Sequence, residues 1–187
     1  MSRLALIPAA LLALALAQLA GCGTPSQPLP MTITTADALQ IRGWVPDALK
    51  GQVNLRPVQG GEDTGRWWGS KVSAAAVQQA LDESLYAVGM KPPAPQPAPR
   101  FELKAELVAL EQPLLPVAAV TVGVAVRYTL ADTNDGRVVY QRLIANNHEA
   151  GFTEAVLSPS ERLRIANEHA LRANINLLLR DLVTLRP

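Results

Sequence analysis

Cysteine, histidine and aromatic side chains are scarce in this sequence of 187 residues. A single cysteine excludes a disulfide within the chain, so a folded domain must be held together by its core. One cysteine and two histidines leave few ligands for a metal site, and we expect neither a metal ion nor another cofactor. Charge is also limited: a formal net charge of +1 gives no basic surface for nucleic acid.

An apolar run from Leu4 to Ala17 follows Arg3 at the start of the chain. The run is shorter than the roughly 20 residues of a membrane-spanning helix, and it is typical of a secretory signal peptide. It leads to Leu19-Ala20-Gly21-Cys22, which resembles the lipobox of bacterial lipoproteins. In that family the cysteine thiol receives a diacylglyceryl group, the leader is cut off before the cysteine, and the new amino group is acylated. The alternative is an ordinary signal peptide with an incidental cysteine.

The lipobox resemblance implies three acyl chains at Cys22 and therefore an anchor in a membrane. Each buried methylene contributes about 0.8 kcal/mol, so three chains would hold the protein to a bilayer almost permanently. Cleavage would remove residues 1–21 with Arg3 and bring the formal charge to zero. Gly23 and Thr24 stand where the aspartate associated with inner-membrane retention would be. In a Gram-negative host, the resemblance thus implies the outer membrane, with the domain on its periplasmic face.

The rest of the chain divides into a tether and one domain. Residues 22–37 contain the lipidated cysteine and many prolines and small polar residues, which predict a flexible tether with a reach of roughly 50 Å. A packed strand at residues 31–35 is the alternative. Residues 38–187 then form a single α+β periplasmic domain. Within it, the proline-rich segment 91–100 favours a polyproline II connector, or else a ligand for a proline-binding module.

Hydrophobic periodicity predicts both strands and helices in this domain. We expect a helix after the N-cap Ser73 and a longer final helix that begins at Ser158, followed by Pro159 and Glu161. The strands are expected at 39–42, 53–56, 101–107, 120–126 and about 138–145, with the last three forming an antiparallel meander. The fold class is therefore α+β: a mostly antiparallel sheet of about five strands with two helices packed on one face.

The final helix carries an apolar stripe that we expect to face the sheet. Its polar side is expected to face solvent and includes Glu168. The stripe consists of Leu163, Ala166, Ala170, Ala173 and Leu177, and the solvent side of Arg164, Glu168, Arg172 and Asn176.

The stretch from Gly60 to Gly65 has the glycine spacing of a phosphate-binding loop. A nucleotide site would also need a lysine and a hydroxyl residue where Arg66 and Trp67 stand, and a helix that starts at once. We therefore expect no nucleotide. Arg66, Trp67 and Trp68 are instead candidates for a partner or ligand contact, since tryptophan is enriched in binding hot spots. The alternative is that both rings close the end of a small core.

Candidates for catalysis are few. His148 near the end of a strand and His169 on the final helix lack partner ligands at metal-binding spacing, and residues 146–148 are typical of a turn. The serines have no nucleophile context such as Gly-x-Ser-x-Gly. Glu102 and Glu106 alternate with Lys104, which indicates a solvated, charge-balanced strand face. We therefore predict no catalytic residues and no enzymatic activity.

The layout of the chain and its closing helix, ERLRIANEHALRANINLLLRDL, resemble the small envelope lipoproteins of proteobacteria. These include the YajG-like family and the auxiliary lipoproteins of ABC-type lipid transport systems. The anchor, the compact core and the lack of a catalytic constellation favour a non-enzymatic accessory or assembly factor that binds a protein partner in an envelope complex. One alternative is a carrier for a lipid or another apolar ligand, held between the helices and the sheet. An envelope hydrolase is the least favoured hypothesis.

Overall fold

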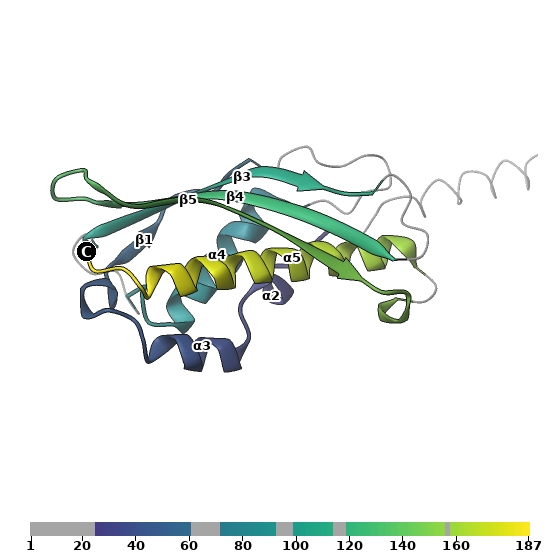
Figure 1. Cartoon of the computed structure of the whole chain (residues 1–187), viewed down its shortest axis with the longest axis horizontal. Helices are drawn as coiled ribbons and strands as arrows, with labels where there is room; N and C mark the ends of the chain where they lie inside the picture. The colour runs from purple at the N-terminus through teal and green to yellow at the C-terminus, as the bar shows by residue number, and fades with distance from the viewer. Residues whose placement is uncertain (1–24, 61–71, 93–98, 114–118, 156–157) are drawn as a thin grey trace, which may run out of the picture.

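The computed structural model describes residues 25–60, 72–92, 99–113, 119–155 and 158–187. In Figure 1 the strands form one layer, and the labelled helices all lie on one side of it. The sheet has five strands and is mostly antiparallel, which confirms the expected α+β class. Among the described residues, none of the helices combines the length and the apolar character of a membrane span.

The sheet is built around the long central strand β3 (Phe101–Glu111). The strand order is β1-β3-β4-β5, and β2 (Gln59–Gly60) also pairs with β3. Strands β1 (Val53–Leu55) and β2 run parallel to β3, whereas β3, β4 (Val120–Asp132) and β5 (Val138–Ala150) form an antiparallel meander. The predicted meander is thus confirmed, and β1 coincides with the second of the two short predicted strands.

Strand β5 continues through the segment that was expected to be a turn. Asn146 and His148 pair with Val124 and Val122 of β4, so the turn predicted at residues 146–148 is wrong. Turn propensity is a local preference, and here the ladder with β4 outweighs it. The extension matters because it carries Asn146 and His148 alongside the final helix.

Glycine at position 60 is required by close packing against β3. Its φ is +81°, and a Cβ at this position would lie 2.3 Å from the carbonyl oxygen of Leu107. No other residue type fits without a shift of the backbone. At least this glycine of the 60–65 stretch therefore has a structural reason that is independent of any ligand.

Both predicted helices form with the predicted caps. Helix α4 (Ala74–Ala87) begins after Ser73, whose hydroxyl accepts from the Ala76 amide, and α5 (Pro159–Leu182) begins after Ser158, whose hydroxyl accepts from the Glu161 amide. Helix α5 contacts β4 and β5 along its length, and α4 contacts β1. These two helices cover the apolar face of the sheet.

Residues 39–42 form part of helix α3 (Thr35–Arg42) and not a strand. The Thr34 hydroxyl accepts from the Asp37 amide at 3.1 Å and caps the helix. Ala38 and Ile41 are buried while Leu39 is exposed, which is the spacing of a helix face. The prediction of a strand was wrong because an alternation over four residues is too short to distinguish the period of a strand from that of a helix.

The segment that was expected to be a tether belongs largely to the domain. Helix α2 (Pro28–Met31) packs against α4 and α5, and Met31 is fully buried. Arg172 Nε donates to the Pro30 carbonyl oxygen at 2.7 Å. Burying a methionine side chain stabilises the fold by about 1.5–3 kcal/mol. The prediction of a flexible tether up to residue 37 is therefore wrong. The alternative, a packed segment at residues 31–35, is correct about the packing but wrong about the strand, because helices form here.

The faces of α5 differ from the expected ones because the helix is covered on two sides. Helices α2 and α3 lie along its flank, away from the sheet. As a result Glu168 is buried, although it was placed on the solvent side, whereas Ala173 and Leu177 of the predicted apolar stripe are exposed. Leu163, Ala166 and Ala170 are buried as expected. Two short 3₁₀ helices, η1 (Asp47–Leu49) and η2 (Phe152–Glu154), complete the described elements.

Candidate functional site

Polar side chains line the contact between β5 and α5, which we call the β5–α5 seam. It comprises Tyr140, Arg142, Asn146 and His148 of β5 with His169, Asn174 and Asp181 of α5. At one end, the Tyr140 hydroxyl and Arg142 Nη1 both donate to the Asp181 carboxylate, at 2.7 Å each. Partial burial, and then the hydrogen bond with Asp181, raise the pKa of Tyr140 above its usual value.

The middle of the seam is a buried amide network. Asn174 is fully buried and donates through Nδ2 to the Ile144 carbonyl oxygen at 2.9 Å and to Asn146 Oδ1 at 2.7 Å. Its Oδ1 accepts from the buried Tyr128 hydroxyl at 2.9 Å. Asn146 Nδ2 in turn donates to the Ala170 carbonyl oxygen. These bonds fix how strand β5 and helix α5 are aligned, because each buried polar group there has a partner.

The far end of the seam brings together the two histidines of the chain. His148 Nε2 lies 3.2 Å from His169 Nδ1, and the two rings meet edge to face, with centroids 5.0 Å apart and planes at 84°. Glu154 Oε2 lies 4.0 Å from His169 Nδ1. One donor atom from each of these three residues falls within 4.8 Å of the other two. Within the described ranges, this cluster could hold a metal ion.

Each member of the cluster is positioned by the backbone around it. His148 follows Asn146 on the helix-facing side of β5, and His169 lies on the turn of α5 next to Ala170. Glu154 ends the 3₁₀ helix η2, and its Oε1 accepts from the Gly151 amide at 3.0 Å. That bond leaves Oε2 on the side of the histidines.

The electrostatics of the cluster favour uncharged imidazole. Partial burial lowers the pKa of His169 below its usual value, and the positive charges of Arg172 and of a protonated His148 lower it further. Glu154 and Glu168 act in the opposite direction but are outweighed. His169 is therefore neutral at pH 7, which is the form that can donate a ring-nitrogen lone pair to a metal.

The cluster opens into a hollow of about 470 Å³ on the outer side of α5. Both histidines line it together with Asp37, Arg172 and Leu177. Asp37 lies 3.7 Å from Arg180, and Arg172 contacts Pro30, so the nearby charges already have partners. The hollow gives a small ion or molecule direct access to the ring nitrogens.

Sequence reasoning missed this cluster, and its expectation that the histidines lack partners is wrong. The ligand atoms come from three separate elements, so no short spacing in the chain reveals them. The residue counts on either side of Ser158 give no signal, because a strand rises about 3.3 Å per residue and a helix only about 1.5 Å.

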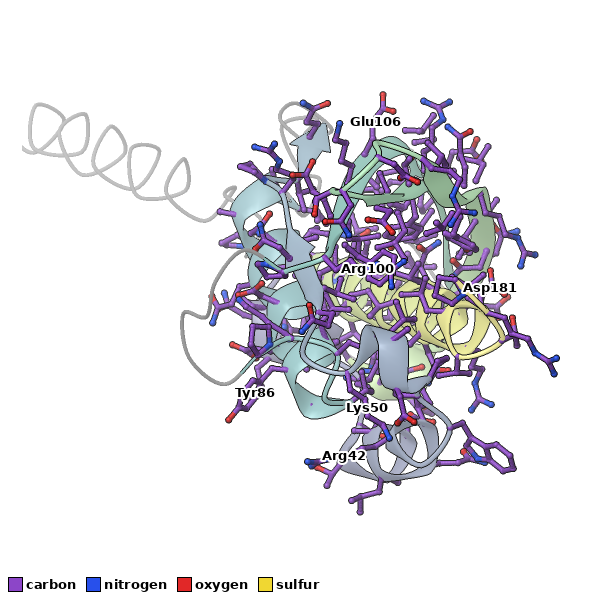
Figure 2. The ribbon with its side chains drawn as sticks, turned by 90° about the vertical axis from the view of Figure 1, so that its left-hand side faces the viewer. Arg42, Lys50, Tyr86, Arg100, Glu106 and Asp181 are labelled. Atoms are coloured by element: carbon purple, nitrogen blue, oxygen red, sulfur yellow. The ribbon has the colours of Figure 1, made fainter. Side chains whose placement is uncertain are left out.

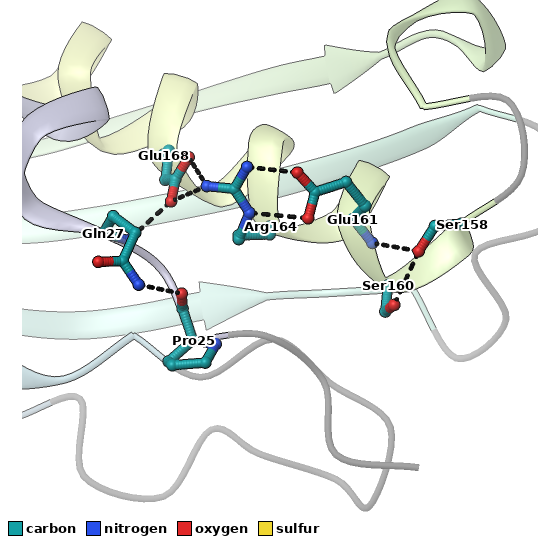
Figure 3. Close-up of polar contacts among 7 residues, drawn as sticks. All are labelled: Pro25, Gln27, Ser158, Ser160, Glu161, Arg164 and Glu168. Carbon is teal, nitrogen blue, oxygen red and sulfur yellow. Dashed lines mark hydrogen bonds and ion pairs between the residues drawn. The ribbon is translucent and has the colours of Figure 1, made fainter. Parts of the chain in front are cut away.

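An ion-pair network lies on the flank of α5 (Figure 3). Arg164 Nη1 donates to both carboxylate oxygens of the buried Glu168, at 2.6 and 2.7 Å, and its Nε donates to Glu161 at 2.9 Å. The Gln27 amide also donates to Glu168, at 2.7 Å. The hydrogen bonds from Arg164 to Glu161 and to Glu168 tie successive turns of α5 together. The bond from the Gln27 amide ties the helix to the N-terminal segment.

The opposite face of the sheet carries a second hollow, of about 460 Å³. Lys104, Glu106 and Arg127 line it, and Arg127 Nη1 lies 2.6 Å from Glu106. In Figure 2, Glu106 lies at the end of the molecule opposite Arg42 and Lys50. Glu102 is likewise 2.6 Å from Arg56. The predicted charge-balanced strand face is therefore confirmed.

The other predicted site residues, Cys22, Arg66, Trp67 and Trp68, lie outside the described residues, as does most of the proline-rich connector. Among the described residues, Trp44 is a tryptophan that stands at the surface, with about three quarters of its area exposed. Sequence reasoning did not single it out, because a lone aromatic residue after a short helix gives no pattern.

The fold defines a class of structures: solved structures that share it include small bacterial lipoproteins. A protein from Caulobacter crescentus described as a lipoprotein matches with a TM-score of 0.51 at 10% identity, over 78% of this chain and 93% of its own. A Xanthomonas campestris protein of the DUF330 family also reaches 0.51, at 14% identity, over 75% and 79%. A minor lipoprotein from Acinetobacter baumannii reaches 0.45, at 11% identity, over 72% and 92%.

These identities show a shared fold. No protein-family model and no curated protein sequence matches the chain. The resemblance to small bacterial lipoproteins is thus confirmed in the architecture of the domain.

Proposed function

We propose that this chain is an outer-membrane lipoprotein whose periplasmic domain acts as a non-enzymatic accessory or assembly factor in an envelope complex. One observation carries the proposal: a lipobox ending in Cys22 precedes a domain whose fold occurs in small bacterial lipoproteins. The residues after the cysteine, Gly23 and Thr24, support the outer membrane.

The structure adds a constraint on where such a domain would work. Gln27 follows Cys22 by only five residues, and its amide is bonded to Glu168. Five residues span at most about 18 Å, so an anchor at Cys22 would keep the domain close to the bilayer surface. A partner of this domain would therefore be a membrane protein or a protein held close to the membrane.

A binding role is also supported by the acidic residues of the two hollows. Glu106 is paired with Arg127, and Asp37 faces Arg180. A carboxylate that is already engaged in an ion pair with an arginine is not free to accept a proton from a substrate. The carrier alternative is disfavoured by the polar network of Tyr128, Asn146 and Asn174, which occupies the contact between helix and sheet.

Cys22→Ala is expected to move the protein from the membrane fraction to the soluble periplasm, because the thiol is the site of acylation. Fractionation of a Gram-negative host measures the distribution, and mass spectrometry of the mature N-terminus should show three acyl chains on the wild-type protein. A matched control is Gly23→Asp, which keeps the cysteine and is expected to redirect the protein to the inner membrane. An unmodified Cys22, or an uncut leader, would contradict the proposal.

The accessory role predicts a partner that depends on the anchor. Cross-linking in whole cells followed by purification of the lipidated protein should enrich one envelope protein relative to Cys22→Ala. Loss of that protein from the Gly23→Asp sample would place the contact at the outer membrane. If the two variants and the wild-type protein yield the same background, the accessory role is wrong even where the anchor is correct.

A further inference from the structure

We propose that His148, His169 and Glu154 form a binding site for a divalent first-row transition metal such as Zn²⁺. The proposal goes beyond the envelope role and does not depend on it. It rests on the positions of three ligand atoms, on the bond that orients the glutamate and on the open hollow beside them.

The spacing of the two ring nitrogens fits a shared metal ion. Zinc lies about 2.0–2.1 Å from each histidine nitrogen in tetrahedral sites, which puts two such nitrogens roughly 3.3 Å apart. His148 Nε2 and His169 Nδ1 are 3.2 Å apart. The two nitrogens already have the separation that they would have around one ion, so binding needs rotation of the rings but little rearrangement of the backbone.

The third ligand needs only a small side-chain movement. Glu154 Oε2 is 4.0 Å from His169 Nδ1, somewhat more than the roughly 3.3 Å of two ligands in a tetrahedral zinc site. The other carboxylate oxygen accepts from the Gly151 amide, which is the kind of outer bond that orients a ligating carboxylate. Rotation of the glutamate about this bond would bring Oε2 into the coordination sphere.

The surroundings give the ion access and a further ligand position. Both histidines line the hollow of about 470 Å³, so a water molecule or a small ligand can complete the coordination. Arg172 is the closest source of repulsion, and its Nε is directed to the Pro30 carbonyl oxygen. Two imidazoles and one carboxylate suit zinc, nickel, cobalt and copper better than magnesium or calcium, which prefer oxygen ligands.

A hydrogen bond between two neutral imidazoles would give a similar nitrogen separation. Such a bond would not require the nearby carboxylate, whereas a metal would use all three groups. The two explanations differ in what Glu154 does, and a titration can therefore separate them.

The test uses the full-length lipidated protein in detergent, purified through a tag without histidine and stripped with a chelator. Zn²⁺ is titrated in competition with a coloured chelator, and Co²⁺ is added in parallel to observe visible absorption. We expect one Zn²⁺ per chain. Bound Co²⁺ should give visible absorption bands whose intensity indicates coordination of low symmetry. His148→Ala, His169→Ala and Glu154→Gln should each weaken binding by at least about tenfold, since even outer-shell changes have effects of that size.

Glu149→Gln is the matched control, because this exposed residue is next to His148 but contacts Thr121 on the other side of β5. It should bind Zn²⁺ like the wild-type protein. His148→Gln and His169→Gln repeat the test with polar side chains, and circular dichroism confirms that each variant is folded. Zn²⁺ binding that survives in both His148→Ala and His169→Ala, or that is no tighter in the wild-type protein than in a variant with both substitutions, would overturn the proposal. Binding that is lost with the histidines but unchanged in Glu154→Gln would exclude the three-ligand site.

Discussion

Arg164→Met is expected to lower the free energy of unfolding by about 3–5 kcal/mol, because it leaves a buried carboxylate without its partner. Glu168 has only 2% of its surface exposed and receives two hydrogen bonds from Arg164 Nη1. Methionine keeps the length of the side chain but supplies no donor. Among the described residues, Glu168 would then keep the hydrogen bond from the Gln27 amide, which cannot compensate the charge. Urea unfolding followed by circular dichroism measures the loss.

Two further variants make this measurement specific. Arg180→Met removes another arginine of the same helix, but one that is half exposed and 3.7 Å from Asp37, so it should change the free energy by less than about 1 kcal/mol. Adding Glu168→Gln to Arg164→Met removes the buried charge as well and should restore much of the stability. If Arg164→Met is no more destabilising than Arg180→Met, the pair of Arg164 with the buried Glu168 does not contribute measurably to the stability of the fold.

Local signals in the sequence were sufficient to predict the helix caps, the β4–β5 turn and the buried face of β4, because each is determined by residues within the element itself. Ser73 and Ser158 cap their helices through their own hydroxyl groups, and Asp135-Gly136 lies in the turn between β4 and β5, where Gly136 has a φ of +73°. The alternating valines of β4 face the core as the pattern predicts. Such features were predictable because the interactions that produce them span only a few residues.

The failures share a different cause, which is contact between distant segments. Nothing near Glu168 in the sequence reveals that Gln27 and helix α2 will cover it. The same holds for the histidine cluster, where His148, Glu154 and His169 meet because β5 runs on to Ala150 before the chain turns back as α5. Hydrophobic periodicity identifies the apolar face of a helix, but it does not show whether other segments of the chain will cover the polar face.

The two errors in the N-terminal region have a functional consequence. A tether of 16 residues would allow the domain to search the periplasm for a partner, whereas a segment packed from Gln27 onward does not. Met31 is buried and Arg172 holds the Pro30 carbonyl oxygen, so the domain begins almost at the proposed anchor. If Cys22 is acylated, the histidine cluster lies at the anchored end of the domain, because His169 directly follows Glu168.

Asn174→Leu is expected to destabilise the fold by about 2–4 kcal/mol, although leucine has the same number and branching of side-chain heavy atoms. The change removes the partner of the buried Tyr128 hydroxyl and of Asn146 Oδ1, and each buried polar group left unpaired costs about 1–3 kcal/mol. Burial raises the pKa of Tyr128 far above its usual value, so the hydroxyl cannot escape this cost by ionising. Urea unfolding measures the effect.

A double-mutant cycle with Tyr128→Phe separates the network from simple packing. Tyr128→Phe alone removes one donor and leaves Asn174 Oδ1 unpaired, whereas in the double variant Asn174→Leu/Tyr128→Phe neither group remains to be satisfied. The double variant should therefore be more stable than the sum of the two single losses implies, by about 1 kcal/mol or more. Strict additivity would mean that the two side chains act independently. In that case Asn174 would stabilise the β5–α5 seam through Ile144 and Asn146 alone, and the alignment that brings His148 to His169 would not involve β4.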